Sequence, residues 1–259
     1  MVGKVLMNYN FKGGVGKSTL TAMQGYLMAK KNKKILLIDF DPQENLSEMI
    51  CDTYKIYKDA MVPFSKSLNN GNLSSSIVSM TNNLDIIKAD DGLNEWTDRI
   101  SNLKKSVRWN ILREKIEPLK NDYDYILIDV PPTFNDIVAN AIFACDGISV
   151  VLQTQKMSYT SALKTVKKLI SLRAEYNPSF KFLGVIIYLY QKAKIDNEIA
   201  KDAQNYFKKA VYENKIQAQE RVKGFTAYGI TERDHWDFRS IGMYQRVVDE
   251  IEERAQEMI

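Results

Sequence analysis

The sequence of 259 residues contains two cysteines and one histidine, so chemistry that needs clusters of these side chains has little to draw on. Cys51 and Cys145 lie far apart in the chain and form no metal-ligand pair, which favours reduced, buried thiols. His235 stands among charged and aromatic residues, where we expect a loop residue rather than a general base. Disulfide scaffolds, cysteine-ligated iron–sulfur clusters and histidine-based metal sites are therefore not expected.

Long apolar runs are also missing. No run approaches the roughly 20 residues that a membrane-spanning helix needs, and the N-terminus begins a strand almost at once rather than a signal peptide. We therefore expect a soluble, cytoplasmic protein without a membrane partner. The formal net charge of +4 does not by itself indicate a nucleic-acid partner, and an apolar content of 45% is ample for a buried core.

The most informative feature is a glycine-rich segment from Asn10 to Thr19, with the sequence N-F-K-G-G-V-G-K-S-T. It follows an apolar run over 2–7 and precedes a helix-like run over 20–31. Strand, glycine loop and helix can hold a phosphate chain, because backbone N–H groups turn towards the phosphates and the helix dipole points its positive end at them. In such a loop Lys17 supplies a charge for the β- and γ-phosphates, and Ser18 supplies a hydroxyl for Mg²⁺.

Apolar, β-branched runs alternate with helical patterns along the chain. This alternation predicts an α/β fold, with a mostly parallel, twisted sheet covered by helices on both faces. With the glycine loop after the first strand, the predicted arrangement resembles the architecture of a P-loop NTPase. We expect one domain over 1–259, with an irregular elaboration around 52–82. Ligands then bind beyond the carboxyl ends of the strands. The predicted strands are Val2–Asn8, Lys34–Asp39, Leu84–Lys88, Tyr125–Asp129, Gly147–Leu152 and Phe182–Leu189, and the predicted helices are Ser18–Lys31, Lys104–Lys120, Asp136–Ala144, Ser158–Tyr176, Ile195–Ala210 and Ile241–Met258.

Aspartates follow two of the predicted strands. Asp39 and Asp41 lie in the string L-L-I-D-F-D-P-Q-E-N, and Asp129 lies in I-L-I-D-V-P-P. Beside a phosphate loop, such carboxylates can hold Mg²⁺ directly or through water, and can orient a water against the γ-phosphate. The alternative is that an aspartate merely caps the following helix, and this stays open for Asp39 above all.

The glycine loop departs from the usual pattern, which has a glycine where this chain has Phe11. A second lysine, Lys12, directly precedes the paired glycines, and this K-G-G-x-G-K-[ST] arrangement resembles the deviant Walker A loop of the ParA/MinD superfamily. The D-x-D-P-Q-x-N string resembles the ParA branch, and D-V-P-P looks like the family's Walker B and switch II region. The likeness continues in pattern to the C-terminal helix. Tyr188 stands where relatives often carry a small polar residue, which leaves the adenine contacts open.

The resemblance implies an ATPase that uses ATP and Mg²⁺, works as a homodimer and is weak without its partner. Lys12 would reach across a nucleotide-sandwich dimer to the partner's phosphate, and Asp41 would position the attacking water. Ser18 would bind the metal ion, Asp129 would support it through water, and Asp41 is a second candidate ligand. The catalytic residues would be Lys12, Lys17 and Asp41, and the nucleotide would be held by Lys12, Gly13, Gly14, Val15, Gly16, Lys17, Ser18 and Thr19.

Basic residues gather in two segments. Residues 181–223 contain nine basic and five acidic side chains, and residues 156–173 contain five basic and no acidic ones. Such clusters could neutralise DNA phosphates on one face, or could be ordinary solvated helix faces. The resemblance implies that the ATP-bound dimer binds double-stranded DNA without sequence preference. The candidate contacts are Lys192, Lys194, Arg221 and Lys223.

By the same resemblance, the chain would be a nucleoid-associated partition ATPase of the short form, without an N-terminal helix-turn-helix domain. A centromere-binding, ParB-like adaptor would stimulate hydrolysis and release it from DNA, which would segregate a plasmid or a chromosome. The alternative is a MinD-like or protein-cluster-positioning ATPase that acts on a membrane or protein cargo. MinD-like proteins end in a basic amphipathic helix, whereas residues 249–259 are acidic and should be repelled by anionic lipid. Iron–sulfur reductases and synthetases share the loop, but the cysteine contexts and the D-P-Q string disfavour them.

Overall fold

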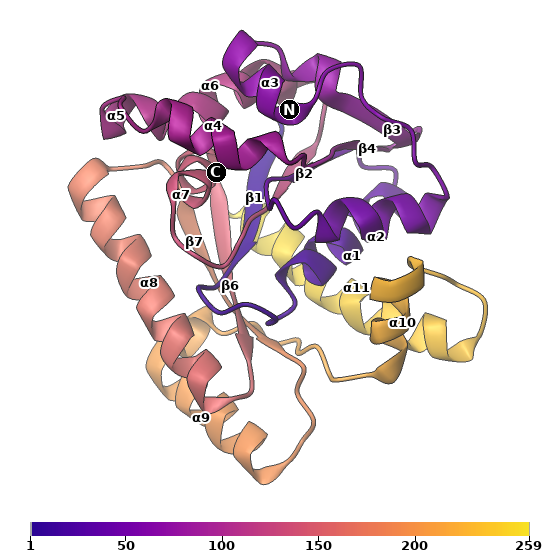
Figure 1. The fold of residues 1–259 in the computed structure, drawn as a ribbon. Coiled ribbons are helices and arrows are strands. Elements are labelled where there is room, and N and C mark those ends of the chain that lie inside the picture. The colour runs from indigo at the N-terminus through magenta and orange to yellow at the C-terminus, as the bar shows by residue number, and fades with distance from the viewer. Residues whose placement is uncertain (1, 259) are drawn as a thin grey trace.

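The computed structural model describes residues 2–258 of the chain. Within this part, seven strands form one sheet in the order β3-β4-β2-β5-β1-β6-β7 (Figure 1). All neighbouring strands pair in parallel except β3, which runs antiparallel to β4. The predicted α/β fold with a mostly parallel sheet is confirmed. The strands are β1 (Lys4–Tyr9), β2 (Ile35–Asp39), β3 (Ile77–Thr81), β4 (Leu84–Ile87), β5 (Tyr125–Asp129), β6 (Gly147–Gln153) and β7 (Lys181–Tyr188).

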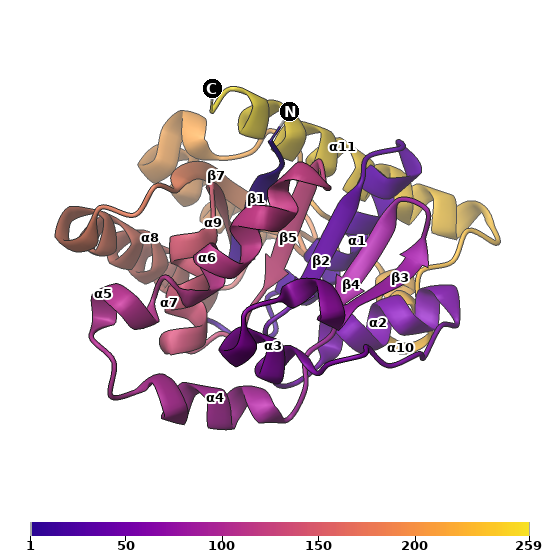
Figure 2. The ribbon, with the colours of Figure 1, turned by 90° about the horizontal axis from the view of Figure 1, so that it is seen from above.

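Helices cover both faces of the sheet (Figures 1 and 2). Each face has its own apolar core, and the side chains of a strand alternate between the two cores. In β5, for example, Ile126 and Ile128 enter one core while Tyr125 and Leu127 enter the other. This two-sided burial explains why the strands read as continuous apolar runs, since each buried Ile or Leu contributes about 1.5–3 kcal/mol.

The first core lies under α3 to α9, and the second lies under α1, α2, α10 and α11. In Figure 1 the long helix α11 crosses beneath the sheet beside α1, and α8 and α9 project together from the opposite side. The helices are α1 (Lys17–Lys30), α2 (Asn45–Tyr54), α3 (Phe64–Asn70), α4 (Gly92–Ile100), α5 (Lys105–Arg108), α6 (Ile111–Ile116), α7 (Asp136–Ala144), α8 (Lys156–Tyr176), α9 (Lys194–Phe207), α10 (Glu220–Tyr228) and α11 (His235–Gln256).

The helix predicted over Lys104–Lys120 is wrong as a single element. It is divided into α5, α6 and a 3₁₀ turn over Glu117–Asn121. The break comes from the buried side chain of Asn140, which donates to the carbonyl of Arg108 at 2.7 Å and accepts the N–H of Leu112 at 3.1 Å. These two backbone groups would bond each other in a continuous helix. A tertiary contact therefore replaces one turn of the helix ladder.

The sequence also left several elements unpredicted. The region 52–82 contains the end of α2, then α3, a 3₁₀ turn and the edge strand β3, so it is more regular than expected. Helices α4 and α10 were not anticipated. Helix α11 begins at His235 rather than Ile241, because the carboxylate of Asp234 accepts the N–H groups of Trp236 and Asp237 and caps it there.

The parallel pairing brings the carboxyl ends of β1, β2, β5, β6 and β7 to one edge of the sheet. The register aligns Asp39 at the end of β2 directly with Asp129 at the end of β5. The glycine loop leaves β1 at the same edge. No helix within residues 2–258 is long and apolar enough to cross a bilayer.

Candidate nucleotide-binding site

The segment between β1 and α1 folds as an open loop whose backbone faces outward. Gly14 and Gly16 have φ angles of +71° and +92°, a conformation that favours glycine. A Cβ on Gly14 would meet no atom within 4 Å, so the loop borders open space there. Gly13 and Gly14 are also exposed. The loop therefore offers its N–H groups to a ligand.

The N-terminus of α1 is arranged to receive an anion. Gly16 is the N-cap residue and supplies no side-chain hydrogen bond, and the first turn contains no acidic residue. The first N–H groups and the positive end of the helix dipole are therefore available to a phosphate. Lys17, the first residue of the helix, is buried. Burial lowers the pKa of its ammonium group, and the carboxylates of Asp129 and Asp41 partly offset this effect.

Asn10 fixes the entrance of the loop. Its side chain is fully buried and donates to the carbonyl of Val151 at 2.7 Å. Its Oδ1 accepts the N–H of Lys12 at 3.0 Å and the hydroxyl of Ser161 at 2.6 Å. Ser161 belongs to α8, and a second residue of this helix, Thr165, accepts the N–H of Phe11 at 3.2 Å. The start of the loop is thus attached to α8 as well as to its own strand.

Lys12 lies half-buried at the mouth of the loop. Its Nζ donates to Oε1 of Gln155 at 2.7 Å, and Gln155 is the N-cap residue of α8. The lysine that the sequence assigned to the partner's phosphate is therefore held by a glutamine of its own chain. The acceptor is a neutral amide and the bond is exposed, so Lys12 can exchange it for an ion pair with an anionic oxygen.

Asp39 and Asp129 form a buried carboxylate pair at the ends of neighbouring strands. Asp39 accepts the N–H and the hydroxyl of Ser47 at 2.8 and 2.7 Å, and Ser47 lies in the first turn of α2. Asp39 therefore accepts a backbone N–H in the first turn of α2, although Glu44 is the N-cap residue of that helix, and a part for Asp39 in metal binding stays a prediction. Burial first, and the charge of Asp129 second, raise the pKa of Asp39 to about 8.

Asp129 is buried differently. Neither of its carboxylate oxygens has a hydrogen-bond partner among residues 2–258. Burial raises its pKa to about 6, and the adjacent Ser18 hydroxyl and Lys17 ammonium limit that rise without giving either oxygen a bond of ordinary geometry. An unpaired buried carboxylate is costly, so this site is suited to a cation or to water bound to one.

Asp41 completes this group of charges. Its Oδ1 accepts the N–H of Gln43 at 3.1 Å, and its own N–H donates to Asp39 at 3.2 Å. Asp41 is buried and close enough to Lys17 and Asp129 to affect both of their pKa values. The loop after β2 therefore brings Asp41 to the phosphate loop, as the sequence predicted from strand ends.

The residues of the loop and the aspartates beside it fit a nucleoside triphosphate with Mg²⁺. In the part of the chain that the structure describes, no group of three or more acidic, histidine or cysteine side chains is arranged to hold a metal ion. A Mg²⁺ ion here would rely on phosphate oxygens and the Ser18 hydroxyl, with Asp129 behind it, which is how Mg²⁺ usually binds at phosphates. The roles of the individual loop residues remain predictions.

A pocket of about 420 Å³ adjoins the loop, a volume that suits a nucleoside. It extends from the phosphate loop over the ends of β6 and β7 to α10. Its polar lining includes three glutamine side chains and Glu220. The lining residues are Gly14, Gly16, Thr19, Gln153, Tyr188, Leu189, Gln191, Ala218, Gln219, Glu220, Val222, Lys223 and Thr226.

The four candidate DNA contacts occupy different settings. Lys192 and Lys194 are exposed, at the turn into α9 and in its first residue. Lys223 lines the pocket beside the loop and pairs with Glu220 at 2.9 Å. Arg221 is engaged by Asp234 and Asp237 at the start of α11. Lys192 and Lys194 are thus the freer pair, and the DNA contacts stay a prediction.

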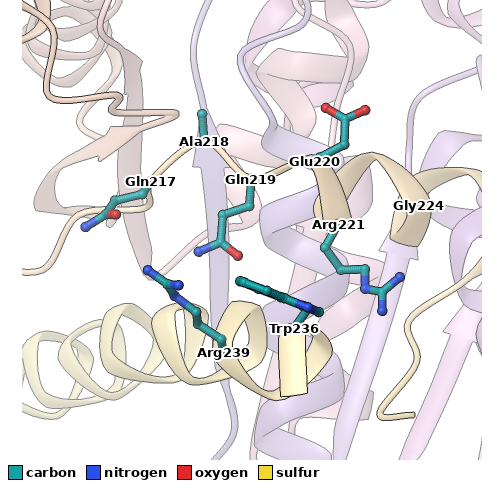
Figure 3. A pocket seen from close by; sticks show the side chains of 8 residues that line it. All are labelled: Gln217, Ala218, Gln219, Glu220, Arg221, Gly224, Trp236 and Arg239. Carbon is teal, nitrogen blue, oxygen red and sulfur yellow. The ribbon is translucent and has the colours of Figure 1, made fainter. Parts of the chain in front are cut away.

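A second hollow lies on the outer side of the segment 217–221. It has a volume of about 540 Å³ and shares Ala218, Gln219 and Glu220 with the first pocket. Figure 3 shows the ring of Trp236 and the guanidinium of Arg239 facing Gln217 and Gln219 across it, while Arg221 points away. The segment 217–221 therefore separates the pocket beside the phosphate loop from this second hollow and lines both of them.

Sequence reasoning missed Asn10, Gln155, Ser161 and Thr165, which position the loop. Asn10 carried a weak signal, since it is a polar residue directly after a buried strand. Gln155 and the two hydroxyl residues carried none, because their role depends on the packing of α8 against the loop. The sequence noted Tyr188 only as a departure from relatives.

Fold and site together define a P-loop NTPase. A family model described as "AAA domain" matches residues 3–182, and the chain belongs to this family. Within it the chain is ParA-like. The chromosome partitioning protein ParA of Caulobacter vibrioides is 27% identical over 234 residues, which cover 87% of this chain and 85% of ParA. The predicted recognition of a ParA-type protein is confirmed.

Two solved structures show the same fold. Apo McdA from Cyanothece has a TM-score of 0.84 at 22% identity, covering 97% of this chain and 98% of McdA. Cobyrinic acid a,c-diamide synthase from Mycobacterium smegmatis, with an ATP analogue and magnesium bound, has a TM-score of 0.79 at 20% identity and covers 96% of this chain and 93% of the synthase. At these identities the likeness concerns the fold, and it agrees with the prediction of ATP and Mg²⁺ as ligands.

Proposed function

We propose that the chain is a Mg²⁺-dependent ATPase that partitions DNA, a plasmid or a chromosome. The observation that carries the proposal is the combination of an open glycine loop with a second lysine, Lys12, at its mouth. This stands beside a buried Asp129 without a partner in residues 2–258. ParA, which matches over most of the chain, is a chromosome partitioning protein.

Each residue has a task in hydrolysis that its position supports. The N–H groups from Gly13 to Thr19 would hold the phosphates, and Lys17 would neutralise charge on the β- and γ-phosphates. Mg²⁺ would supply charge neutralisation and orientation when bound, held by Ser18 with Asp129 behind it. Asp41 would accept a hydrogen bond from the attacking water and fix its line of approach.

Lys12 makes the dimer part of the chemistry. To reach a partner's phosphate, it would exchange the bond to the neutral amide of Gln155 for an ion pair with an anionic oxygen, which adds the attraction of two opposite charges. A positive charge delivered from the second chain would then stabilise the transition state as an arginine finger does. Two chains face to face are therefore needed for full activity, and basal hydrolysis would be slow.

The dimer would bind DNA through exposed lysines, without sequence preference, and would be found on the nucleoid. ATP can drive this only through its higher affinity for the dimer. A centromere-binding, ParB-like adaptor would stimulate hydrolysis and release the chain. We infer a single domain over 1–259 for these tasks.

The second candidate is an ATPase that positions a protein or membrane cargo with the same cycle. It shares the loop, the carboxylates and the dimer, and differs only in what the ATP state binds. The basic side chains of α8 favour DNA over this alternative, since residues 156–173 carry five basic and no acidic side chains, and most of the basic ones are exposed.

The deciding experiment measures binding to random-sequence duplex DNA without nucleotide, with ADP and with ATP plus Mg²⁺, over a salt series. We expect binding only with ATP, weakening steeply with salt. Lys17→Ala should bind no nucleotide, and Lys12→Ala should bind nucleotide but lose hydrolysis. ATP hydrolysis without DNA binding in any state would contradict partition and favour a protein or membrane cargo, with vesicle co-sedimentation next. Full ATPase activity of Lys12→Ala would show that the lysine does not act across the dimer.

A further inference from the structure

Tyr188 lies directly beneath the phosphate loop. It is the last residue of β7, and 2% of its side chain is exposed. Its ring is so close to Gly16 that an added Cβ would come within 2.1 Å of it. Gly16 is also the N-cap residue of α1 and has a φ of +92°. The aromatic ring therefore packs directly against the last turn of the loop before Lys17.

The hydroxyl group of Tyr188 is held from two sides. It is hydrogen-bonded to the hydroxyl of Tyr244 in α11, and it lies beside the hydroxyl of Thr19 in the first turn of α1. The two tyrosine rings pack edge to face, with centroids 6.2 Å apart. Burial raises the pKa of Tyr188 to about 12 and raises the pKa of Tyr244 well above its ordinary value, so both hydroxyls keep their protons at neutral pH.

We propose that Tyr188 is a positioning residue for the phosphate loop, which it holds in its binding conformation before a nucleotide arrives. The ring prevents Gly16 from relaxing towards the sheet, and the hydroxyl connects the first turn of α1 to α11. A loop that is already ordered loses less entropy when it binds. The inference rests on the proposed function only in that the loop binds phosphates.

A competing role for Tyr188 is direct contact with the base, since the residue also lines the 420 Å³ pocket. The two roles make different demands on the ligand. If the ring supports Gly16, its loss lowers the affinity for every ligand that binds to the loop, whatever base the ligand carries. If the ring contacts the base, its loss lowers the affinity for ATP and leaves the affinity for a ligand without a base unchanged.

The test compares wild type with Tyr188→Leu and Tyr188→Phe by calorimetric titration with ATP, GTP and inorganic tripolyphosphate, each with Mg²⁺. Leucine removes the flat ring, whereas phenylalanine keeps the ring and loses the hydroxyl. We expect Tyr188→Leu to weaken all three ligands by a similar factor of at least about tenfold, and Tyr188→Phe to weaken them by no more than about threefold. Tyr244→Phe is the matched control, because it breaks the same hydroxyl contact from α11, and it should resemble Tyr188→Phe.

Wild-type affinity for all ligands in Tyr188→Leu would overturn the proposal, and so would a loss confined to ATP. Circular dichroism melting shows whether Tyr188→Leu is folded. Hydrogen exchange without nucleotide needs no ligand: the amide of Leu20, which donates to the carbonyl of Gly16 at 2.9 Å, should exchange slowly in wild type and faster in Tyr188→Leu. Exchange at the rate of an open peptide in wild type would contradict a preformed loop. If wild type binds none of the ligands while Lys17→Ala is equally inactive, the proposed ATPase function fails, and the exchange measurement still decides the role of Tyr188.

Discussion

At the scale of single residues, the buried carboxylates of Asp39 and Asp129 show how a ligand-binding site lowers the stability of the folded chain. They meet because β2 and β5 are neighbours in register, and both are fully buried. Asp39 offsets its burial by accepting three hydrogen bonds, two from Ser47 and one from Asp41. Asp129 has no such compensation among residues 2–258. The burial of Asp129 therefore destabilises the folded chain, and a bound cation would reduce this cost.

This pair predicts how stability depends on pH. Burial first raises the pKa of Asp39 to about 8 and that of Asp129 to about 6, above the ordinary value of aspartate near 4. Within that window the folded chain holds a proton that the unfolded chain lacks. The free energy of unfolding should therefore fall as the pH rises from about 4 to about 8, by at most about 1.4 kcal/mol per pH unit for one proton.

Urea unfolding between pH 5 and pH 8.5, without Mg²⁺ or nucleotide, measures this slope. Asp39→Asn removes one of the two charges and keeps an acceptor for the N–H of Ser47, so its slope should be smaller than that of wild type. Asp85→Asn, on β4 and away from the pair, serves as the control and should leave the slope unchanged. A free energy of unfolding that does not change with pH in wild type would show that the pair is ionised at all of these pH values.

Asp41 predicts a separation of binding from hydrolysis. Asp41→Ala should bind ATP, because the loop and Lys17 are intact, but hydrolysis should fall by roughly 100-fold or more, the usual worth of a group that guides proton transfer. The ATP-bound dimer should persist, which light scattering during size-exclusion chromatography would show. A variant that stays monomeric with ATP would mean that Asp41 acts in dimer formation rather than in positioning water.

At the scale of elements, the sequence was most informative where local pattern and tertiary structure agree. Helix α7 has the predicted bounds, and its N-cap Asn135 accepts the N–H of Val138 at 3.1 Å. The predicted 104–120 helix failed because Asn140, distant in sequence, supplies the bonds that the ladder would have used. Strand β3 could not be predicted because it is a short edge strand, and only two of its five residues are buried.

The start of α11 predicts an effect on stability. Asp234 caps the helix and pairs with Arg221 of α10, so it joins two elements beside the nucleotide pocket. Asp234→Ala should lower the free energy of unfolding by about 1 kcal/mol, with an upper value near 2, the usual cost of a lost N-cap.

Asp234→Ser retains a cap and loses the ion pair, so comparison of the two variants separates these contributions. The pair is exposed, and its loss should cost less than the loss of the cap. Urea unfolding of both variants gives the answer. Equal destabilisation by serine and alanine would assign the effect to the ion pair instead.

At the scale of the whole molecule, the site is a consequence of strand order. The sequence could predict the loop and the aspartates because each follows a buried strand, and parallel strands end at one edge. It could not predict that Asn10, Ser161 and Thr165 tie the loop to α8, since no local pattern records which helix packs there. Nor could it tell that Arg221 is occupied by Asp234 and Asp237 whereas Lys192 is exposed.

That difference in setting predicts which lysines bind DNA. Lys192 and Lys194 lie one and three residues after Gln191, which lines the nucleotide pocket, and both are exposed. A contact with phosphate from this turn would sense the state of the pocket. The double variant Lys192→Ala/Lys194→Ala should therefore weaken ATP-dependent DNA binding without changing ATP affinity. Each lost phosphate contact should also reduce the slope of log affinity against log salt by about one.

The matched control removes the same charge from the opposite end of the molecule. Lys66 of α3 and Arg113 of α6 are exposed, and Figure 1 shows both helices at the top of the fold while α9 lies at the bottom. Lys66→Ala/Arg113→Ala should leave the salt slope as in wild type. Equal losses in both double variants would mean that DNA responds to net charge alone, since long-range attraction does not depend on where a charge sits. A loss confined to the first double variant would place the DNA contact beside the nucleotide, where ATP can control it.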